Sequence, residues 1–231
     1  STSYSFGGCI ASMNSNMTII ENNFTNSLSL TDGGGAIYNS KSGLYIYDSK
    51  FDGNSAEFGG SICNINSVLD SYQSIYRNNH ANLYGGVIYD IYGTLNFYVN
   101  QFYVSHAQAG GTLYTRIPND VNMQRNTIGD SFAKEGASIF YDGKKENVMV
   151  NSYGNDYTVF AEFRATLDGK EYYLISNPLY YQLTSYDTST KYFPYSVFEV
   201  NDGLVSLMIN GNDDEENLTS IITHDAVNSI S

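Results

Sequence analysis

The chain has 231 residues, of which 24 are acidic and 11 are Lys or Arg, so its formal net charge is −13. This acidic balance, with no basic run, argues against a nucleic-acid partner, because a phosphate backbone is bound by clustered cations. No apolar run approaches the length of a membrane span, so we expect no membrane insertion within this chain.

A glycine-pair motif recurs six times. The chain begins without Met, and Ser1–Phe6 leads into the first copy, so we expect a mature chain or a piece of a longer one. Gly34-Gly35-Ala36-Ile37 is typical of the copies, and the second position of the pair recurs every 25 to 27 residues. The apolar residue two positions later is Ile10, Ile37, Ile62, Ile88, Leu113 or Ile139. This recurrence predicts a repeat protein.

A second set of positions recurs at the same interval, about sixteen residues after each glycine pair; we call each such set a column. Its bulky members are Phe24, Phe51, Ile75, Phe102, Ile128 and Tyr153. The polar residues two positions before them are Asn22, Ser49, Gln73, Asn100, Asn126 and Asn151. The residues seven positions before them are Met17, Leu44, Val68, Leu95 and Val121, and Glu146 breaks this series.

The repeat length and composition predict the fold. A unit of this size cannot bury a core alone, so the copies must stack. Tyr, Ile, Thr, Ser, Asn and Gly favour strands and turns over helices, and Leu44-Tyr45-Ile46-Tyr47 alternates with period two. We therefore predict an all-β fold with a parallel β-helix of about six coils over residues 1–156.

Alternation assigns faces to the columns. The aliphatic and bulky columns should point inward, and the asparagines should lie at a coil corner, where their amides bond to each other and to turn backbone. The glycine pairs should form a corner that needs φ > 0 or close backbone approach. Coil three has Asp70 where an apolar residue is expected.

No copy of the motif follows Asp156, so residues 157–231 read as a second unit. The pattern predicts six or seven short strands, with a hairpin around Asn201-Asp202-Gly203. We predict a small Ig-like β-sandwich there, and the alternative is a set of capping strands on the end of the rod.

The sequence offers few reactive side chains. Cys9 and Cys63 fall in coils one and three, about 9.6 Å apart along the stack, so we expect two free thiols. With His80 and His106 they show no metal-ligand spacing, and we expect no metal and no cofactor. Three Asn-x-Ser/Thr triplets make Asn16, Asn23 and Asn217 candidate glycosylation sites.

An enzyme on this fold would need carboxylates in register on neighbouring coils. Asp48 with Gln73 and Asp90 with Thr115 show no such cluster. Asp52 and Arg77 are 25 positions apart and could be neighbours, but a surface ion pair explains them as well. We therefore expect no catalytic residue.

The pairing of Gly34-Gly35-Ala36-Ile37 with Phe51-Asp52-Gly53-Asn54 resembles the repeat of the polymorphic outer-membrane protein family. The second element has drifted in coil four, where Phe102 is followed by Ser105. The wider texture is similar to the adhesin-like surface proteins of methanogenic archaea. These resemblances imply a right-handed parallel β-helix, Ig-like modules after it, and an extracellular or cell-surface location.

Two functional hypotheses remain open. By alternation Tyr38, Tyr89, Tyr114 and Phe140 point outward, as a stripe that could stack on sugar rings or dock a partner unless a loop or the end segment covers it. An uncapped coil end would instead let copies add end to end. We therefore expect a non-catalytic, adhesin-like cell-surface protein that presents a rod for attachment to glycans or surfaces. The alternative is a self-assembling subunit of an extracellular filament, sheath or cell envelope.

Overall fold

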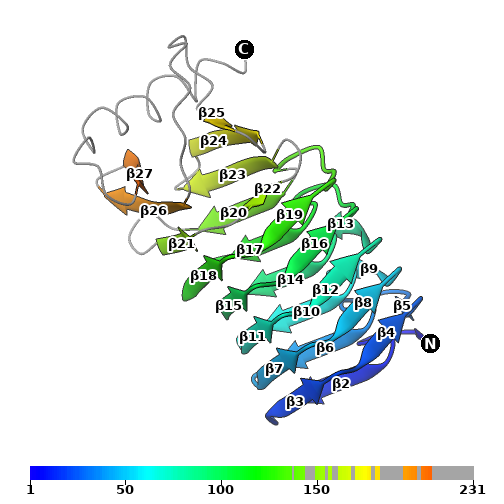
Figure 1. Cartoon of the computed structure of the whole chain (residues 1–231). Helices are drawn as coiled ribbons and strands as arrows, with labels where there is room; N and C mark the ends of the chain where they lie inside the picture. Colours follow the sequence, from blue (N-terminus) through cyan, green and yellow to red (C-terminus); the bar gives the residue numbers. More distant parts are fainter. Residues whose placement is uncertain are drawn as a thin grey trace.

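A computed structural model describes residues 1–136, 138–143, 149–153, 156–157, 161–167, 170–177, 180–182, 195–201 and 204–209. All secondary structure in these segments is β-strand. The strands stack coil upon coil into a rod, which Figure 1 shows from the blue N-terminal coil to the green coils near β20. The chain thus forms the predicted all-β, right-handed parallel β-helix. Within the described residues, no helix is long and apolar enough to cross a membrane.

Four sheets run along the rod, and we name them A to D. Sheet A contains β1 (Thr2–Ser3), β5 (Leu28–Ser29), β9 (Ser55–Phe58) and β13 (His80–Tyr84). Sheet B contains β2 (Ile10–Met13), β6 (Ile37–Ser40), β10 (Ile62–Ile65), β14 (Ile88–Ile91), β17 (Leu113–Arg116) and β20 (Ile139–Gly143), followed by β23 (Ala161–Leu167), β24 (Lys170–Asn177) and β25 (Tyr180–Gln182).

The other two sheets complete each coil. Sheet C contains β3 (Met17–Ile20), β7 (Gly43–Tyr47), β11 (Val68–Tyr72), β15 (Thr94–Tyr98), β18 (Asp120–Gln124) and β21 (Met149–Tyr153), followed by β26 (Tyr195–Asn201) and β27 (Leu204–Ile209). Sheet D contains β4 (Asn23–Thr25), β8 (Lys50–Asp52), β12 (Ile75–Arg77), β16 (Gln101–Tyr103), β19 (Thr127–Gly129) and β22 (Asp156–Tyr157). After each glycine pair the chain therefore passes through sheets B, C, D and A in turn.

The core consists of the columns that the repeat predicts. Ile37, Ile62 and Ile88 pair in register across β6, β10 and β14 and are fully buried. Phe24 and Phe51 stack with ring centroids 4.8 Å apart and continue the core behind sheet D. One coil covers the next, which is how a short repeat buries a continuous core.

The third coil differs from the expected column by one residue. Tyr76, not Ile75, pairs with Phe51 and Phe102, and its buried hydroxyl lies 2.8 Å from Ser71 Oγ. The prediction of Ile75 as the inward residue was wrong, because this partner lets a tyrosine replace an apolar side chain in the core. The same shift of one residue applies nearby. Leu69 is the buried residue of β11 that pairs with Leu44, the polar corner residue is Ser74 rather than the predicted Gln73, and Asp70 faces outward.

The sixth copy also differs from its expected column. Tyr153 pairs with Gln124 in sheet C, whereas Tyr157 pairs with Ile128 in sheet D. Five residues lie between the end of β20 at Gly143 and the start of β21 at Met149, against two between β6 and β7, so the fixed spacing misplaced the column. Glu146, which breaks the other series, lies outside the described residues.

The corner amides behave as expected. The backbone N–H of Ser74 donates to Asn100 Oδ1 at 2.9 Å, and that of Asn100 donates to Asn126 Oδ1 at 2.9 Å. Ser27 donates in the same way to Asn54 Oδ1 at 3.0 Å, at the corner between sheets D and A. A side-chain oxygen of the next coil thus satisfies a buried backbone donor that the strand ladder leaves unpaired.

Each corner also holds one residue with positive φ. At the corner between sheets A and B it is the first glycine of the pair, for example Gly85 with φ +67. The second glycine has a different reason: a Cβ on Gly60 would lie 2.2 Å from the carbonyl oxygen of Gly86 in the next coil. Both expected reasons for the glycine pair, positive φ and close backbone approach, are therefore present.

The fourth coil places aromatic and β-branched side chains in this conformation. Tyr92, Val99 and Val104 all have positive φ at three successive corners and are 49 %, 49 % and 41 % exposed. A left-handed conformation costs an L-residue roughly 1–2 kcal/mol, most for β-branched side chains. The pairing on both sides of each corner therefore imposes the conformation, whatever the residue.

The strands after residue 157 extend two of the sheets. β23 pairs in parallel with β20, and β24 and β25 follow antiparallel. β26 pairs antiparallel with β21 and forms a hairpin with β27 around residues 202–203, as predicted. These are pairings that capping strands would make. The division into residues 1–156 and 157–231, with an Ig-like sandwich in the second part, stays a prediction.

Gly60→Ala should lower the free energy of unfolding by about 2–4 kcal/mol, because backbone atoms of the next coil occupy the position of the new methyl group. Urea unfolding followed by far-UV circular dichroism measures this. The matched control is Gly53→Asn, since Gly53 has φ +68 at a corner where Asn26 and Asn78 adopt the same conformation. Equal stability of the two variants would contradict the close-approach argument.

Candidate functional site

The predicted binding stripe lies outside sheet B but is largely covered. Tyr114 and Phe140 are only 8 % and 7 % exposed, and Tyr38 and Tyr89 are half-buried. Tyr84, which precedes a glycine pair, covers the stripe, with its ring centroid 4.6 Å from that of Tyr114. Side chains before and after the glycine corner thus meet on the outside of the coil.

We call this cluster the aromatic seam; it comprises Phe6, Tyr38, Phe58, Tyr84, Tyr89, Tyr114 and Phe140. Phe58 packs on Tyr89 at 5.1 Å, and Tyr114 stacks on Phe140 at 5.1 Å with the rings 1° from parallel. Burial raises the pKa of Tyr89 to about 12. Packing within the molecule uses most of these ring faces, so the seam offers a ligand less surface than the sequence predicted.

The outer face of sheet C is more open. Its strands alternate strictly, so that in β7 Leu44 and Ile46 are buried whereas Tyr45 and Tyr47 face outward. The same alternation holds in β11, β15 and β18. Three columns of outward side chains therefore run along the rod on this face.

The first column is a tyrosine ladder, Tyr47, Tyr72 and Tyr98. Adjacent ring centroids are 5.3 and 4.8 Å apart, and the rings are within 15° of parallel. The rings pack mainly on each other, so the ladder presents ring edges and a row of hydroxyls to solvent. Within the described residues, no side chain or backbone group hydrogen-bonds these three hydroxyls. Burial, together with the nearby Tyr98 and Asp70, raises the pKa of Tyr72.

Beside the ladder lies an amide row, Asp70, Asn96 and Asn122. Asn96 Nδ2 donates to Asp70 Oδ1 at 2.6 Å, and Asn122 Nδ2 donates to Asn96 Oδ1 at 2.9 Å. All three residues are half-buried, which fixes their orientation. The face thus carries hydrogen-bonding groups at the repeat of the coils, about 4.8 Å.

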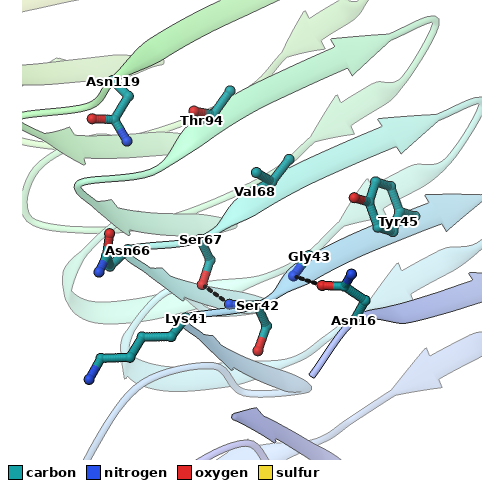
Figure 2. A pocket seen from close by; sticks show the side chains of 10 residues that line it. All are labelled: Asn16, Lys41, Ser42, Gly43, Tyr45, Asn66, Ser67, Val68, Thr94 and Asn119. Carbon is teal, nitrogen blue, oxygen red and sulfur yellow. Dashed lines mark hydrogen bonds between the residues drawn. The ribbon is translucent and has the colours of Figure 1, made fainter. Parts of the chain in front are cut away.

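At the corner between sheets B and C the surface is hollowed into a groove of about 320 Å³. Its lining consists of Asn16, Lys41, Ser42, Gly43, Tyr45, Asn66, Ser67, Val68, Thr94 and Asn119. Figure 2 shows Tyr45 and Asn16 on one side of the groove and Asn66 on the other. We call it the corner groove. It borders the columns of sheet C, so the two surfaces are continuous.

The candidate acids lie apart from this surface. Asp52 binds Arg77 on sheet D, with Arg77 Nε 2.8 Å from its Oδ2, and Lys50 Nζ lies 3.1 Å from the same oxygen. Hydrogen bonding from Arg77, against a partial loss of hydration, lowers the pKa of Asp52 to about 2. The sequence-based pairing of Asp52 with Arg77 is confirmed, and the geometry is that of an ordinary surface ion cluster.

Asp90 is buried inside the rod. Its carboxylate accepts hydrogen bonds from Asn64 Nδ2 at 2.7 Å, Thr115 Oγ1 at 2.8 Å and the Gly93 N–H at 3.3 Å. Asn39 Nδ2 extends the network to Asn64 at 2.8 Å. Burial raises the pKa of Asp90 to about 6 despite these donors. Asp90 is enclosed by this network and does not line the corner groove. We therefore interpret it as part of the polar interior of the rod.

The other predicted site residues are scattered. Asn16 and Asn23 are exposed, Asn217 lies outside the described residues, and glycosylation stays a prediction. Cys9 and Cys63 are both free, and burial raises the pKa of the Cys63 thiol. The described residues contain no group of three or more His, Cys, Asp or Glu side chains that could hold a metal ion.

Reasoning from sequence missed the tyrosine ladder and the corner groove. The ladder has a signal, since Tyr47, Tyr72 and Tyr98 recur at steps of 25 and 26 residues next to the tracked columns. The corner groove has only the weak signal of a glycine within a strand.

The fold and this patterned face define a β-helical repeat protein. Within it, residues 17–40 match the model of the Chlamydia polymorphic membrane protein repeat. The matched segment begins with β3 and ends with β6, so it covers nearly one coil and includes a glycine pair. No curated protein and no solved structure matches the chain. The repeat match and the fold are compatible with a non-catalytic surface protein.

Asp90→Asn should change how stability depends on pH. The folded-state pKa of about 6 lies above the ordinary value of 3.8, so the folded protein binds an extra proton between these values. Wild-type stability should therefore fall, relative to the variant, as the pH rises from 4 to 7, by up to about 3 kcal/mol. Urea unfolding of both proteins at pH 4, 5.5 and 7 measures this. A difference that stays constant with pH would contradict the assignment.

Proposed function

We propose that the protein is a non-catalytic, adhesin-like surface protein that binds glycans through the outer face of sheet C. The observation that supports this most directly is the tyrosine ladder beside the amide row. Sugars are bound by oriented hydroxyl, amide and carboxylate groups next to aromatic rings, and this face supplies all of them. The resemblance to a membrane-protein repeat suggests an extracellular location.

The repetition of this face suits a repetitive ligand. An isolated hydroxyl or amide contributes little net affinity, because binding exchanges one hydrogen bond to water for another. A glycan chain can contact several coils at once, and linked contacts strengthen one another. The net charge of −13 disfavours nucleic acid and strongly anionic surfaces.

A self-assembling subunit is the second candidate. β3 and β4 each pair with one neighbour in the described residues, so their other edge could accept a further coil from another copy or from a longer chain. Mass photometry and negative-stain microscopy separate the candidates. Filaments that lengthen with protein concentration would support assembly, whereas isolated rods that bind glycans would support an adhesin. The likeness to archaeal surface proteins stays an expectation.

Tyr72→Ala should weaken glycan binding at least fivefold, because it removes the centre of the tyrosine ladder. A glycan array identifies ligands of the wild-type protein, and titration calorimetry compares the variants. The matched control is Tyr103→Ala, which removes a half-buried outward tyrosine from sheet D and should leave binding unchanged. If the wild-type protein binds no glycan on the array, the proposed function is wrong.

A further inference from the structure

We propose that the corner groove is a subsite for one uncharged sugar residue of an extended neutral glycan. This inference rests on the proposed function and deepens it by naming the ligand class and the place where one ring is held. The groove borders sheet C, so a chain along the tyrosine ladder and amide row could place a residue in it. Three features of its lining support the inference.

Gly43 makes room for the Tyr45 ring at the groove. It is a strand residue without positive φ, so its backbone does not require glycine. Its neighbours in the outward column, Val68 in the next coil and Thr94 in the one after, carry side chains. A Cβ on Gly43 would lie 2.9 Å from Tyr45 Cε2, Tyr45 Oη and Asn16 Oδ1. The missing side chain therefore lets the Tyr45 ring lean over the strand toward the groove. A glycine within a strand often marks a site of close approach by a ligand.

Some polar side chains of the groove are held in place by hydrogen bonds, and others have donors or acceptors without a partner in the described part of the chain. Asn16 is positioned by accepting the Gly43 N–H through Oδ1 at 2.8 Å, and its Nδ2 lies on the side of Tyr45 (Figure 2). Asn119 is positioned by donating through Nδ2 to the Tyr92 carbonyl at 2.9 Å, and its Oδ1 can accept a hydrogen bond from a ligand. In the described part of the chain, the side chains of Asn66 and Thr94 and the Tyr45 hydroxyl have no hydrogen-bond partner. These donors and acceptors surround the apolar side chain of Val68.

The charge of the lining indicates the ligand class. Lys41 is the one charged residue among the ten that line the groove. It is exposed and forms no ion pair with a described residue. A site for a sulfated or carboxylated sugar would be expected to hold several cations, or an Arg in bidentate geometry. Amides, hydroxyls, one aromatic ring and an apolar floor instead match the hydroxyls and C–H groups of a neutral sugar.

The test titrates the purified chain with three hexasaccharides by calorimetry. The neutral probes are the β-1,4-linked hexamers of glucose and of N-acetylglucosamine, and the anionic probe is a hyaluronan hexasaccharide. Tyr45→Ala should weaken binding of a neutral probe at least tenfold. Gly43→Ala should weaken it at least fivefold, because its methyl group displaces the Tyr45 ring, and it should still fold, since the atoms it meets are side-chain ends. Tyr103→Ala is the control for a lost tyrosine, and circular dichroism checks folding.

The outcomes separate this inference from the proposed function. If Tyr72→Ala loses binding but Tyr45→Ala and Gly43→Ala bind like wild type, the proposed function stands and the subsite is wrong. If wild type binds none of the probes and no glycan on the array, both are wrong. Addition of 0.5 M NaCl should change affinity less than twofold, because screening weakens only charge-dependent binding. Binding of the hyaluronan probe alone, lost in 0.5 M NaCl, would overturn the neutral class.

Discussion

The parallel pairing between successive coils is the constraint on which the rest of the structure depends. The pairing is continuous through the corners: the positive-φ residue Lys41 donates its N–H to the Ile65 carbonyl at 3.0 Å, and Asn66 donates to Ile91 at 2.7 Å. In the first five coils, each paired residue therefore lies next to its counterpart 25 to 27 positions away. Side chains at equivalent positions of successive coils therefore line up as a column along the rod.

This constraint acts differently inside and outside. Inside, a column must be apolar, as at Ile37, or must satisfy itself, as in the network of Asn64 and Asp90. Outside, water tolerates any polar residue, so a regular outward column such as Tyr47, Tyr72 and Tyr98 is not needed to exclude water from the core. That contrast is why the outer face of sheet C, rather than the interior acids, is the candidate site.

The sequence predicts the coil and its core well, because Ile37 and its counterparts repeat with little variation. It predicts less where a residue depends on a neighbour from another part of the coil. Tyr76 enters the core because Ser71 meets its hydroxyl, and the stripe at Tyr114 is covered because Tyr84 approaches from across the glycine corner. The corner groove depends on a missing side chain at Gly43 and on loops of several coils. The spacing of residues along the sequence does not predict these contacts.

The corners of the fourth coil bear on how such a chain can change. Tyr92, Val99 and Val104 have the same left-handed backbone as their counterparts in the preceding coil, which are Asn66, Gln73 and Asn78. The cost is roughly 1–2 kcal/mol per position, which the neighbouring coils can absorb. Because these side chains point into solvent, a corner mutation alters the surface and leaves the core columns intact. The rod is therefore a scaffold whose surface can diverge faster than its fold.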